Sequence, residues 1–201
     1  MLDRLALKLV KPVTEAAAVR LAARGVKADQ ATLAGFGFGM LAAIMIASGL
    51  TTAAILPILV NRALDGIDGA LARLSNATER GAFLDISLDF VFYAAIPLAF
   101  AALAPEENAF AAAILLAAFV ATGTSFLAFA VMAEKRGLKS TAYPSKSFYY
   151  LGGLTEGTET IACFLAMCWW PQHFAPIAIV YAALCALTSA TRLVAGWKMF
   201  A

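Results

Sequence analysis

Long apolar stretches separated by short polar connections cover most of this chain. Six of them approach the roughly 20 residues that a helix needs to cross a bilayer, and they lie near residues 31–50, 52–72, 82–104, 109–132, 149–170 and 175–196. We therefore predict an all-α polytopic membrane protein that forms one domain over residues 1–201. Its six transmembrane helices should form a bundle over residues 31–196.

The segment 2–24 has a different pattern, with apolar residues along one stripe of a helix and basic residues around the remainder. The stripe holds Leu2, Leu5, Leu9, Val13, Ala16 and Leu21, and the basic residues are Arg4, Lys8, Lys11 and Arg20. This arrangement predicts an amphipathic helix that lies in the headgroup layer of the membrane.

Composition agrees with a membrane protein, because 62% of the 201 residues are hydrophobic and only 14% are charged. The 15 Lys and Arg residues all fall before the first span, near the second-to-third connection, after the fourth span or near the C-terminus. Since basic connections stay in the cytoplasm, both termini and the second-to-third connection should face it. We expect the lipid bilayer as a partner and no nucleic acid.

Acidic residues interrupt the second and third predicted spans at helical spacing. One helix face carries Asp65, Asp68, Gly69, Ala72 and Arg73, and a second carries Gly81, Asp85 and Asp89. Four carboxylates at membrane depth repel one another and are costly to desolvate, so a cation must lie among them or most must be protonated. Oxygen ligands with no Cys or His nearby indicate Mg²⁺, Mn²⁺ or Ca²⁺.

These eight residues have the spacing D-x2-D-G-x2-A-R-x7-G-x3-D-x3-D, which resembles the signature of the CDP-alcohol phosphotransferase, or CDP-alcohol phosphatidyltransferase, family. The chain is similar to a functionally unassigned branch in the bacterial inner membrane. The resemblance implies transfer of a phosphatidyl group from a CDP-linked lipid, such as CDP-diacylglycerol, to an alcohol. CMP would be released, the reaction would serve phospholipid biosynthesis, and the protein would be a homodimer.

The aspartates are the candidate metal ligands. We expect Asp65, Asp68 and Asp85 to bind Mg²⁺ or Mn²⁺, as two ions, with Asp89 sharing the site. The resemblance also implies that Asp89 is the catalytic base that takes the proton of the attacking hydroxyl. The alternative for Asp89 is an acid that only holds another ligand in place.

The small residues of the motif are candidates for nucleotide binding. Gly69, Ala72 and Gly81 would let a cytosine ring and its phosphates approach the helix backbone, or they would only let helices pack closely. Arg73 can contact phosphate or orient a carboxylate through its forked donors. Asp68 is included in this nucleotide-binding group.

The entry of the fifth span is unusually polar and is the candidate acceptor site. Glu156 and Glu159 should face the interior of the bundle, with Lys146 and Arg192 as possible basic partners. The acidic pair favours an unphosphorylated polyol or amino alcohol as acceptor. The alternative is that the glutamates form salt bridges with Arg192 or Lys146.

Residues outside the signature have simpler interpretations. Asp29 and Thr32 are expected to cap the first membrane helix, although the family often has an Asn-x-x-Thr-like element there that contributes to the nucleotide pocket. Asn61 and Arg62 are assigned a supporting role on the face of Asp65. Two small residues, Gly35 and Gly39, offer a packing face for another helix.

Two other functions compete with the enzyme. The four aspartates would serve a divalent cation carrier as a transport site, but carriers usually show paired repeats or broken helices, and the chain shows neither. In a purely structural membrane protein, the acidic residues would merely pair with Arg62, Arg73 and Arg80.

Overall fold

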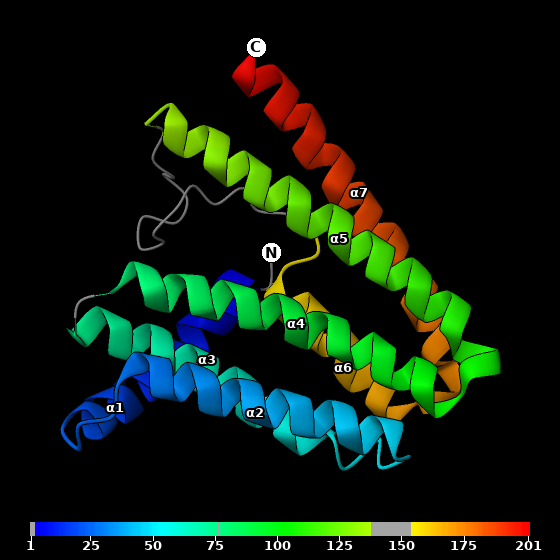
Figure 1. Cartoon of the computed structure of the whole chain (residues 1–201), viewed down its shortest axis with the longest axis horizontal. Coiled ribbons are helices and arrows are strands. Elements are labelled where there is room, and N and C mark those ends of the chain that lie inside the picture. Colours follow the sequence, from blue (N-terminus) through cyan, green and yellow to red (C-terminus); the bar gives the residue numbers. More distant parts are fainter. Residues whose placement is uncertain (1–2, 76, 138–153) are drawn as a thin grey trace.

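A computed structural model describes residues 3–75, 77–137 and 154–201 of the chain. Over these residues the chain forms helices joined by short turns, and no strand occurs among them (Figure 1). The helices are α1 (Asp3–Ala22), α2 (Ala28–Ala47), α3 (Ile55–Ser75), α4 (Glu79–Leu103), α5 (Pro105–Lys135), α6 (Gly157–Trp169), the short 3₁₀ helix η1 (Pro171–His173) and α7 (Phe174–Phe200). The all-α prediction is confirmed for this part of the chain.

Within the part of the chain that the structure describes, four helical stretches are long and apolar enough to cross a membrane. They are α2, α4, α5 and the stretch Pro171–Phe200, which joins η1 and α7. The second predicted span is helix α3, which carries the charges of the motif. The fifth predicted span corresponds in part to α6, whose 13 residues would extend only about 20 Å at the helical rise. The start of this predicted span falls in residues 138–153, outside the described ones. The count of six spans therefore stays a prediction.

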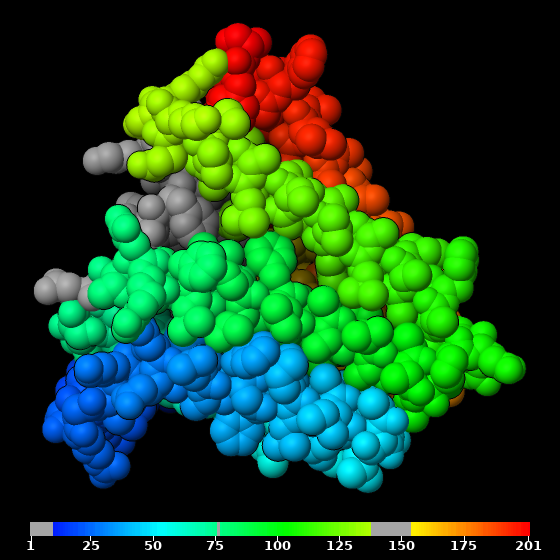
Figure 2. All heavy atoms as spheres, viewed as in Figure 1, coloured from blue at the N-terminus to red at the C-terminus, as the bar shows by residue number. Residues whose placement is uncertain are grey.

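Helix α2 packs against both α3 and α4, and α5 packs against both α4 and α7. α1 crosses the end of α3 that carries the motif, and α6 contacts both helices (Figure 1). On the face seen in Figure 2, side chains fill the space between α2 and α4. The aspartates of α3 and α4 therefore meet inside the bundle.

Aromatic residues of α4 form the centre of the core. The ring of Phe100 stacks on Phe174 of α7 at 4.5 Å between centroids, and Phe92 meets Phe164 of α6 edge-on at 6.1 Å. Lipid tails are as apolar as these side chains, so close van der Waals packing, more than exclusion of water, holds such contacts together in a membrane.

Glycines on α2 permit its close approach to α3 and α4. A Cβ atom on Gly39 would lie 2.6 Å from Cδ2 of Phe92, and one on Gly35 would lie 3.2 Å from Cβ of Leu64. Both glycines are buried. The small-residue face predicted at these positions thus packs against α3 and α4 of the same chain, so it gives no information on where a dimer interface lies.

Helix α1 supports α3 beside the motif. Thr14 and Ala18 are buried against α3, where a Cβ on Gly66 would lie 3.1 Å from Cγ2 of Thr14. Val13 of the predicted apolar stripe is exposed, as Ala16 is. An exposed apolar face suits a helix in the headgroup layer, and this location stays a prediction.

Candidate active site

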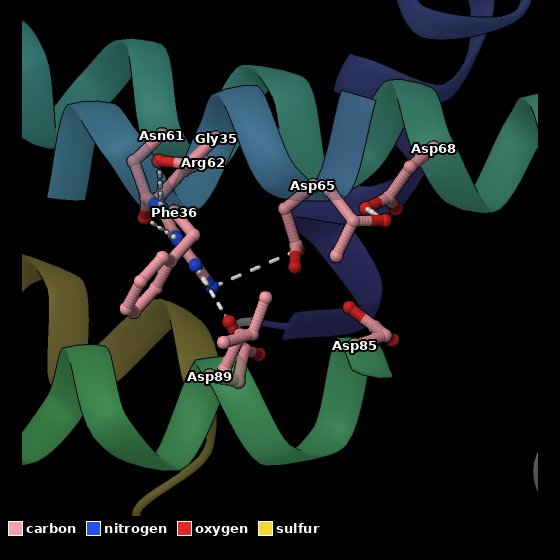
Figure 3. A pocket seen from close by; sticks show the side chains of 10 residues that line it. Gly35, Phe36, Asn61, Arg62, Asp65, Asp68, Asp85 and Asp89 are labelled. Atoms are coloured by element: carbon pink, nitrogen blue, oxygen red, sulfur yellow. Dashed lines mark hydrogen bonds and ion pairs between the residues drawn. The ribbon is translucent and has the colours of Figure 1, made fainter. Parts of the chain in front are cut away.

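Three of the four aspartates converge between α3 and α4. Asp65 and Asp68, one turn apart on α3, and Asp85 on α4 offer carboxylate oxygens that all lie within 4.8 Å of one another (Figure 3). The two helices are joined by a short connection, and Thr78 starts α4 by accepting a hydrogen bond of 3.0 Å from the backbone N–H of Gly81. The tight connection brings the two acidic faces together.

The oxygens of this trio fit a divalent cation. Oxygen ligands lie about 2.0–2.6 Å from Mg²⁺ or Ca²⁺, so two ligands on opposite sides of one ion are roughly 4–5 Å apart. The observed separation matches this limit. Asp68 is buried and Asp65 and Asp85 are half-buried, and converging carboxylates in such a place repel one another unless a positive charge lies among them. The arrangement therefore has the geometry and the charge of a site for a hard metal ion.

Thr32 of α2 fixes the orientation of Asp68. Its hydroxyl donates a hydrogen bond of 2.7 Å to Oδ2 of Asp68 and lies 3.1 Å from the carbonyl oxygen of Ala28. The expectation that Thr32 caps α2 is wrong, because the N-cap is Lys27, whose backbone N–H donates to the side chain of Gln30 at 3.0 Å. Thr32 belongs to the site instead.

Asp29 likewise forms an interhelical contact and does not cap α2. Its carboxylate forms an ion pair with Arg80, and a Cβ on Gly81 would lie 3.2 Å from its Oδ1. Asp29 and Arg80 thereby connect the first turn of α2 to the first turn of α4. Both residues lie at the same end of the bundle as the aspartate trio.

Asp89 lies one turn beyond Asp85 and is held by an arginine. Its Oδ1 accepts a hydrogen bond of 2.7 Å from Nη2 of Arg62, whose Nη1 lies 3.7 Å from Oδ2 of Asp65 (Figure 3). Two of the signature aspartates therefore pair with Arg62, as expected for a purely structural role. Asp65 nevertheless stays gathered with Asp68 and Asp85 in the trio.

Arg62 is itself fixed from several sides. Its Nε donates to Oδ1 of Asn61 at 2.7 Å, and its Nη1 donates to the hydroxyl of Tyr93 at 3.3 Å. The guanidinium carbon lies 4.9 Å from the ring centre of Phe92 and 5.6 Å from that of Tyr93. Asn61 is anchored in turn, since its Nδ2 donates to the backbone oxygen of Gly35 at 2.8 Å. Arg62 therefore has a defined position in the pocket.

One pocket unites these residues at the meeting of α2, α3 and α4. Its lining includes all four aspartates of the signature together with Thr32 and Arg62, which form hydrogen bonds with two of them. The lining residues are Thr32, Gly35, Phe36, Asn61, Arg62, Asp65, Asp68, Asp85, Leu88 and Asp89. Sequence reasoning ranked Arg62 and Asn61 below the signature and missed Tyr93. The signal for Tyr93 is its spacing, because it follows Asp89 by four residues and Asp85 by eight on one helix face.

The small residues of the motif differ in their surroundings. A Cβ on Gly69 would meet only Nη1 of Arg73, at 3.5 Å, whereas one on Gly81 would lie 3.1 Å from Oγ1 of Thr78. Helix packing therefore does not require a glycine at position 69. Ala72 is half-buried and Arg73 is exposed, and Arg73 lines a second pocket between α3 and α1, where Glu15 is the acidic member.

The described members of the candidate acceptor group lie on α6 and α7. Glu156 is the N-cap of α6 and is buried, Glu159 is half-buried in its first turn, and Arg192 is buried on α7. Nη1 of Arg192 donates to the carbonyl oxygen of Thr122 at 3.2 Å, and its guanidinium carbon lies 5.4 Å from the ring centre of Phe126. Lys146 lies outside the described residues.

Hydrogen bonds connect the start of α6 to the part of α7 that carries Arg192. The backbone N–H and the hydroxyl of Thr155 lie 3.3 and 3.0 Å from Oγ1 of Thr188, which precedes Arg192 by one turn. Thr160 and Tyr181 share a further hydrogen bond of 2.7 Å. The described part of the polar entry predicted for the fifth span, residues 155–160, is therefore packed against α7.

The start of α6 lies at about the same depth in the helix bundle as Asp89 of α4. The ring centres of Tyr93 on α4 and Phe164 on α6 are 6.1 Å apart, and the two helices run in the same direction (Figure 1). One turn back from this contact are Asp89 and Thr160, so they lie at a similar depth in the bundle.

Helices long and apolar enough to span a membrane, packed around a carboxylate pocket suited to a hard cation, define a helical membrane protein with a candidate metal site. The sequence profile of the CDP-alcohol phosphatidyltransferase family matches residues 27–190. The chain belongs to this family, as its motif indicated. It transfers a phosphatidyl group from a CDP-linked lipid to an alcohol in phospholipid biosynthesis.

Two similar proteins extend this assignment. The chain is 50% identical over 197 residues to the inner membrane protein YnjF of Escherichia coli strain K12, covering 98% of this chain and 96% of that protein. It also resembles the crystal structure of Mycobacterium tuberculosis phosphatidylinositol phosphate synthase PgsA1 with CDP-DAG bound, with a TM-score of 0.74 and 21% identity over 92% of this chain and 94% of that one. The second likeness shows a shared fold.

Proposed function

We propose that this protein is a divalent-metal-dependent phosphatidyltransferase that uses CDP-diacylglycerol as donor and Mg²⁺ or Mn²⁺ as metal. The observation that carries the proposal is the convergence of Asp65, Asp68 and Asp85 within 4.8 Å at the signature positions of the family. The donor is supported by the structural neighbour, which has CDP-DAG bound.

The aspartate trio would hold the metal, and Thr32 would keep Asp68 in the orientation that the site needs. When bound, the metal would offset the charge of the donor diphosphate and the charge that develops on the departing CMP. Without it, a diphosphate would meet four carboxylates against the single cation of Arg62 in this pocket and would be repelled. The aspartate trio and the donor diphosphate are both negatively charged, so a cation has to bind between them.

Asp89 is assigned as the base for the acceptor hydroxyl. The hydroxyl oxygen forms a bond to the phosphorus of the phosphatidyl group, the bond from that phosphorus to the bridging oxygen breaks, and CMP leaves with that oxygen. The hydroxyl proton passes to Asp89. Because Oδ1 of Asp89 accepts from Arg62 at 2.7 Å, we assign the proton to Oδ2.

Gly69, Ala72, Arg73, Gly81 and Asp68 are proposed to bind the nucleotide. Support comes from position 69, where an added Cβ would meet only the end of Arg73. An unfilled backbone beside a forked cation suits a phosphate or a flat base. Gly81, which packs against Thr78, would contribute mainly by keeping the α3–α4 connection tight.

The acceptor is proposed to bind at Glu156, Glu159 and Arg192, together with Lys146. Support comes from the depth of the start of α6, which matches that of Asp89, and from the burial of Glu156 at 6% exposure and of Arg192 at 7%. Two carboxylates would repel a phosphorylated acceptor and would bind hydroxyl or amino groups well. An unphosphorylated polyol or amino alcohol therefore fits best.

We further propose six membrane spans, a homodimer, and both termini and the active site in the cytoplasm of a bacterium, at its inner membrane. In Figure 1 the α1–α2 and α3–α4 connections lie at the same end of the bundle as the C-terminal ends of α5 and α7. The opposite turns have no basic residue at 49–52, 104–108 or 169–176. This asymmetry supports the orientation.

The test is CMP release by purified protein with CDP-diacylglycerol, Mg²⁺ or Mn²⁺ and a panel of alcohols. Metal-dependent CMP formation that requires one class of acceptor supports the proposal. Metal flux across liposomes that contain the protein, with no CMP formed from any acceptor, would instead favour a cation carrier.

A further inference from the structure

Helix α5 lies between α4, which carries Asp89, and α7, which carries Arg192 (Figure 1). We propose that one turn of α5, at Thr122 and Gly123, is the spacer that sets the distance between these two side chains. Gly123 would thereby be a positioning residue for the acceptor, acting through its neighbours and not through contact with substrate. The inference rests on the proposed function, in which Asp89 is the base and Arg192 binds the acceptor.

The contact between α5 and α4 at this turn leaves no room for a side chain on residue 123. Gly123 is buried, and a Cβ added to it would lie 2.4 Å from Cε1 and 3.0 Å from Cζ of Phe90. The ring of Phe90 therefore occupies space that only a glycine leaves open. Phe90 directly follows Asp89 in α4, so the distance from the base to α5 depends on this contact.

The same turn of α5 binds Arg192 of α7. Nη1 of Arg192 donates a hydrogen bond of 3.2 Å to the carbonyl oxygen of Thr122, and its guanidinium carbon lies 5.4 Å from the ring centre of Phe126. These contacts hold the buried guanidinium against residues 122–126 of α5. The residue that binds Arg192 and the residue that receives Phe90 are therefore adjacent in the chain.

Two phenylalanines fix α4 from opposite sides next to Asp89. Phe92 meets Gly39 of α2, where an added Cβ would lie 2.6 Å from Cδ2 of the ring, much as Phe90 meets Gly123 of α5. Residues two apart on a helix point about 200° away from each other. The rotation of α4 at Asp89 is thereby fixed, and the separation of α4 from α5 is the quantity that Gly123 controls.

A larger residue at position 123 should move α5 and Arg192 away from Asp89. A methyl group there would need a shift of about 1 Å to reach an ordinary carbon–carbon contact with the ring. A misplacement of this size can cost about 10²-fold in rate. Donor binding should be spared, because Asp68 and Gly69 lie on α3, which takes no part in these contacts.

The experiment measures initial rates of CMP release by the purified protein with Mg²⁺, varying donor and acceptor in turn. The donor is CDP-diacylglycerol, and the acceptor probes are glycerol as a polyol and ethanolamine as an amino alcohol. We expect Gly123→Ala to lower kcat/KM for the acceptor by about tenfold or more and to leave the KM for the donor unchanged. Gly196→Ala is the matched control, since its Cβ would lie 3.4 Å from Cδ2 of Phe129, an ordinary contact.

A size-compensating variant separates positioning from a general loss of packing. Leucine lacks Cε1 and Cζ, the ring atoms that a methyl group on residue 123 would meet most closely. Phe90→Leu in the Gly123→Ala background should therefore recover most of the lost kcat/KM. Thermal unfolding in detergent tests the same contact without substrate, and the double variant should unfold at a higher temperature than Gly123→Ala alone.

Unchanged acceptor constants in a folded Gly123→Ala protein would overturn the inference, and so would a double variant that recovers nothing. If Gly123→Ala does not fold, Phe90→Leu alone decides, because it loosens the same contact from the α4 side. It should lower kcat/KM for the acceptor by a smaller factor, and unchanged constants there would also overturn the inference. A wild-type protein that releases no CMP would contradict the proposed function instead, while the coupling of residues 90 and 123 in thermal unfolding would remain.

Discussion

The hydroxyl of Thr32 donates a hydrogen bond of 2.7 Å to Oδ2 of Asp68, across the interface between α2 and α3. This contact connects the helix that begins the family match to the first acidic face of the signature. It also fixes one oxygen of the buried member of the trio. The contact therefore has a measurable consequence for metal binding.

Thr32→Val removes the hydroxyl and keeps the shape of the side chain. A hydrogen bond to a charged group contributes about 1.5–3 kcal/mol, so we expect metal affinity to fall by about tenfold or more. The measurement is CMP release as a function of Mg²⁺ concentration. Thr32→Ser retains the donor and should stay close to the wild type; equal losses in both variants would show that the hydrogen bond is not the cause.

Asp89→Asn should stop catalysis without emptying the metal site. An amide cannot accept the acceptor proton, and loss of a positioned base typically costs about 10²–10⁴ in rate. Mn²⁺ binding should persist because Asp65, Asp68 and Asp85 remain. CMP release and Mn²⁺ dialysis on the same preparation check both statements. An active Asp89→Asn protein would show that another group accepts the proton.

Gly69→Ala should weaken nucleotide binding without harming the fold. An added Cβ would meet only Nη1 of Arg73 at 3.5 Å, so the thermal unfolding temperature in detergent should not fall. The KM for the CDP-lipid should rise, because the methyl group fills the space left for the nucleotide. An unchanged KM would place the nucleotide elsewhere.

Gly39→Ala should destabilise the bundle by about 1–3 kcal/mol, the usual cost of overpacking. Its Cβ would lie 2.6 Å from Cδ2 of Phe92, a buried ring that packs against Phe164. Gly37 is the matched control on the same helix, since a Cβ there would have nothing within 4 Å. Thermal unfolding should show a lower midpoint for Gly39→Ala and no loss for Gly37→Ala.

Glu159→Gln should act on the acceptor alone. Removing one negative charge from the start of α6 should raise the KM for an unphosphorylated acceptor and leave the KM for the donor unchanged. Initial rates of CMP release with each substrate varied in turn separate the two constants. A selective gain with phosphorylated acceptors in this variant would agree with the assigned role of the charge, and a change in the donor constant alone would contradict it.

Much of the site follows from helical spacing within the signature. Residues three and four apart share a helix face, so the pattern alone places Asp65 and Asp68 together and Asp85 with Asp89 on a second face. A short connection between the two helices then brings the faces into contact. The convergence of the trio is confirmed by the structure, whereas ligand roles stay predictions.

Contacts between residues distant in the chain could not be predicted in this way. Thr32 and Asp29 have a satisfactory local explanation as caps, and nothing in a single sequence reveals partners 36 and 51 residues away. The same holds for Arg62, whose pairing with Asp89 depends on how α3 and α4 are rotated against each other. Side-chain choice at a helix interface is decided by tertiary packing.

Helix α3 presents Arg62 and its aspartates to neighbouring helices, and it presents apolar side chains such as the exposed Leu56 and Leu59 to the outside. A helix with these side chains is a poor candidate for entering hydrocarbon alone, because Arg62 and the aspartates would lack the partners that α2 and α4 provide. Its integration during biosynthesis is thereby coupled to that of α2 and α4. The signature that defines the chemistry thus also dictates that these three helices be assembled as one unit.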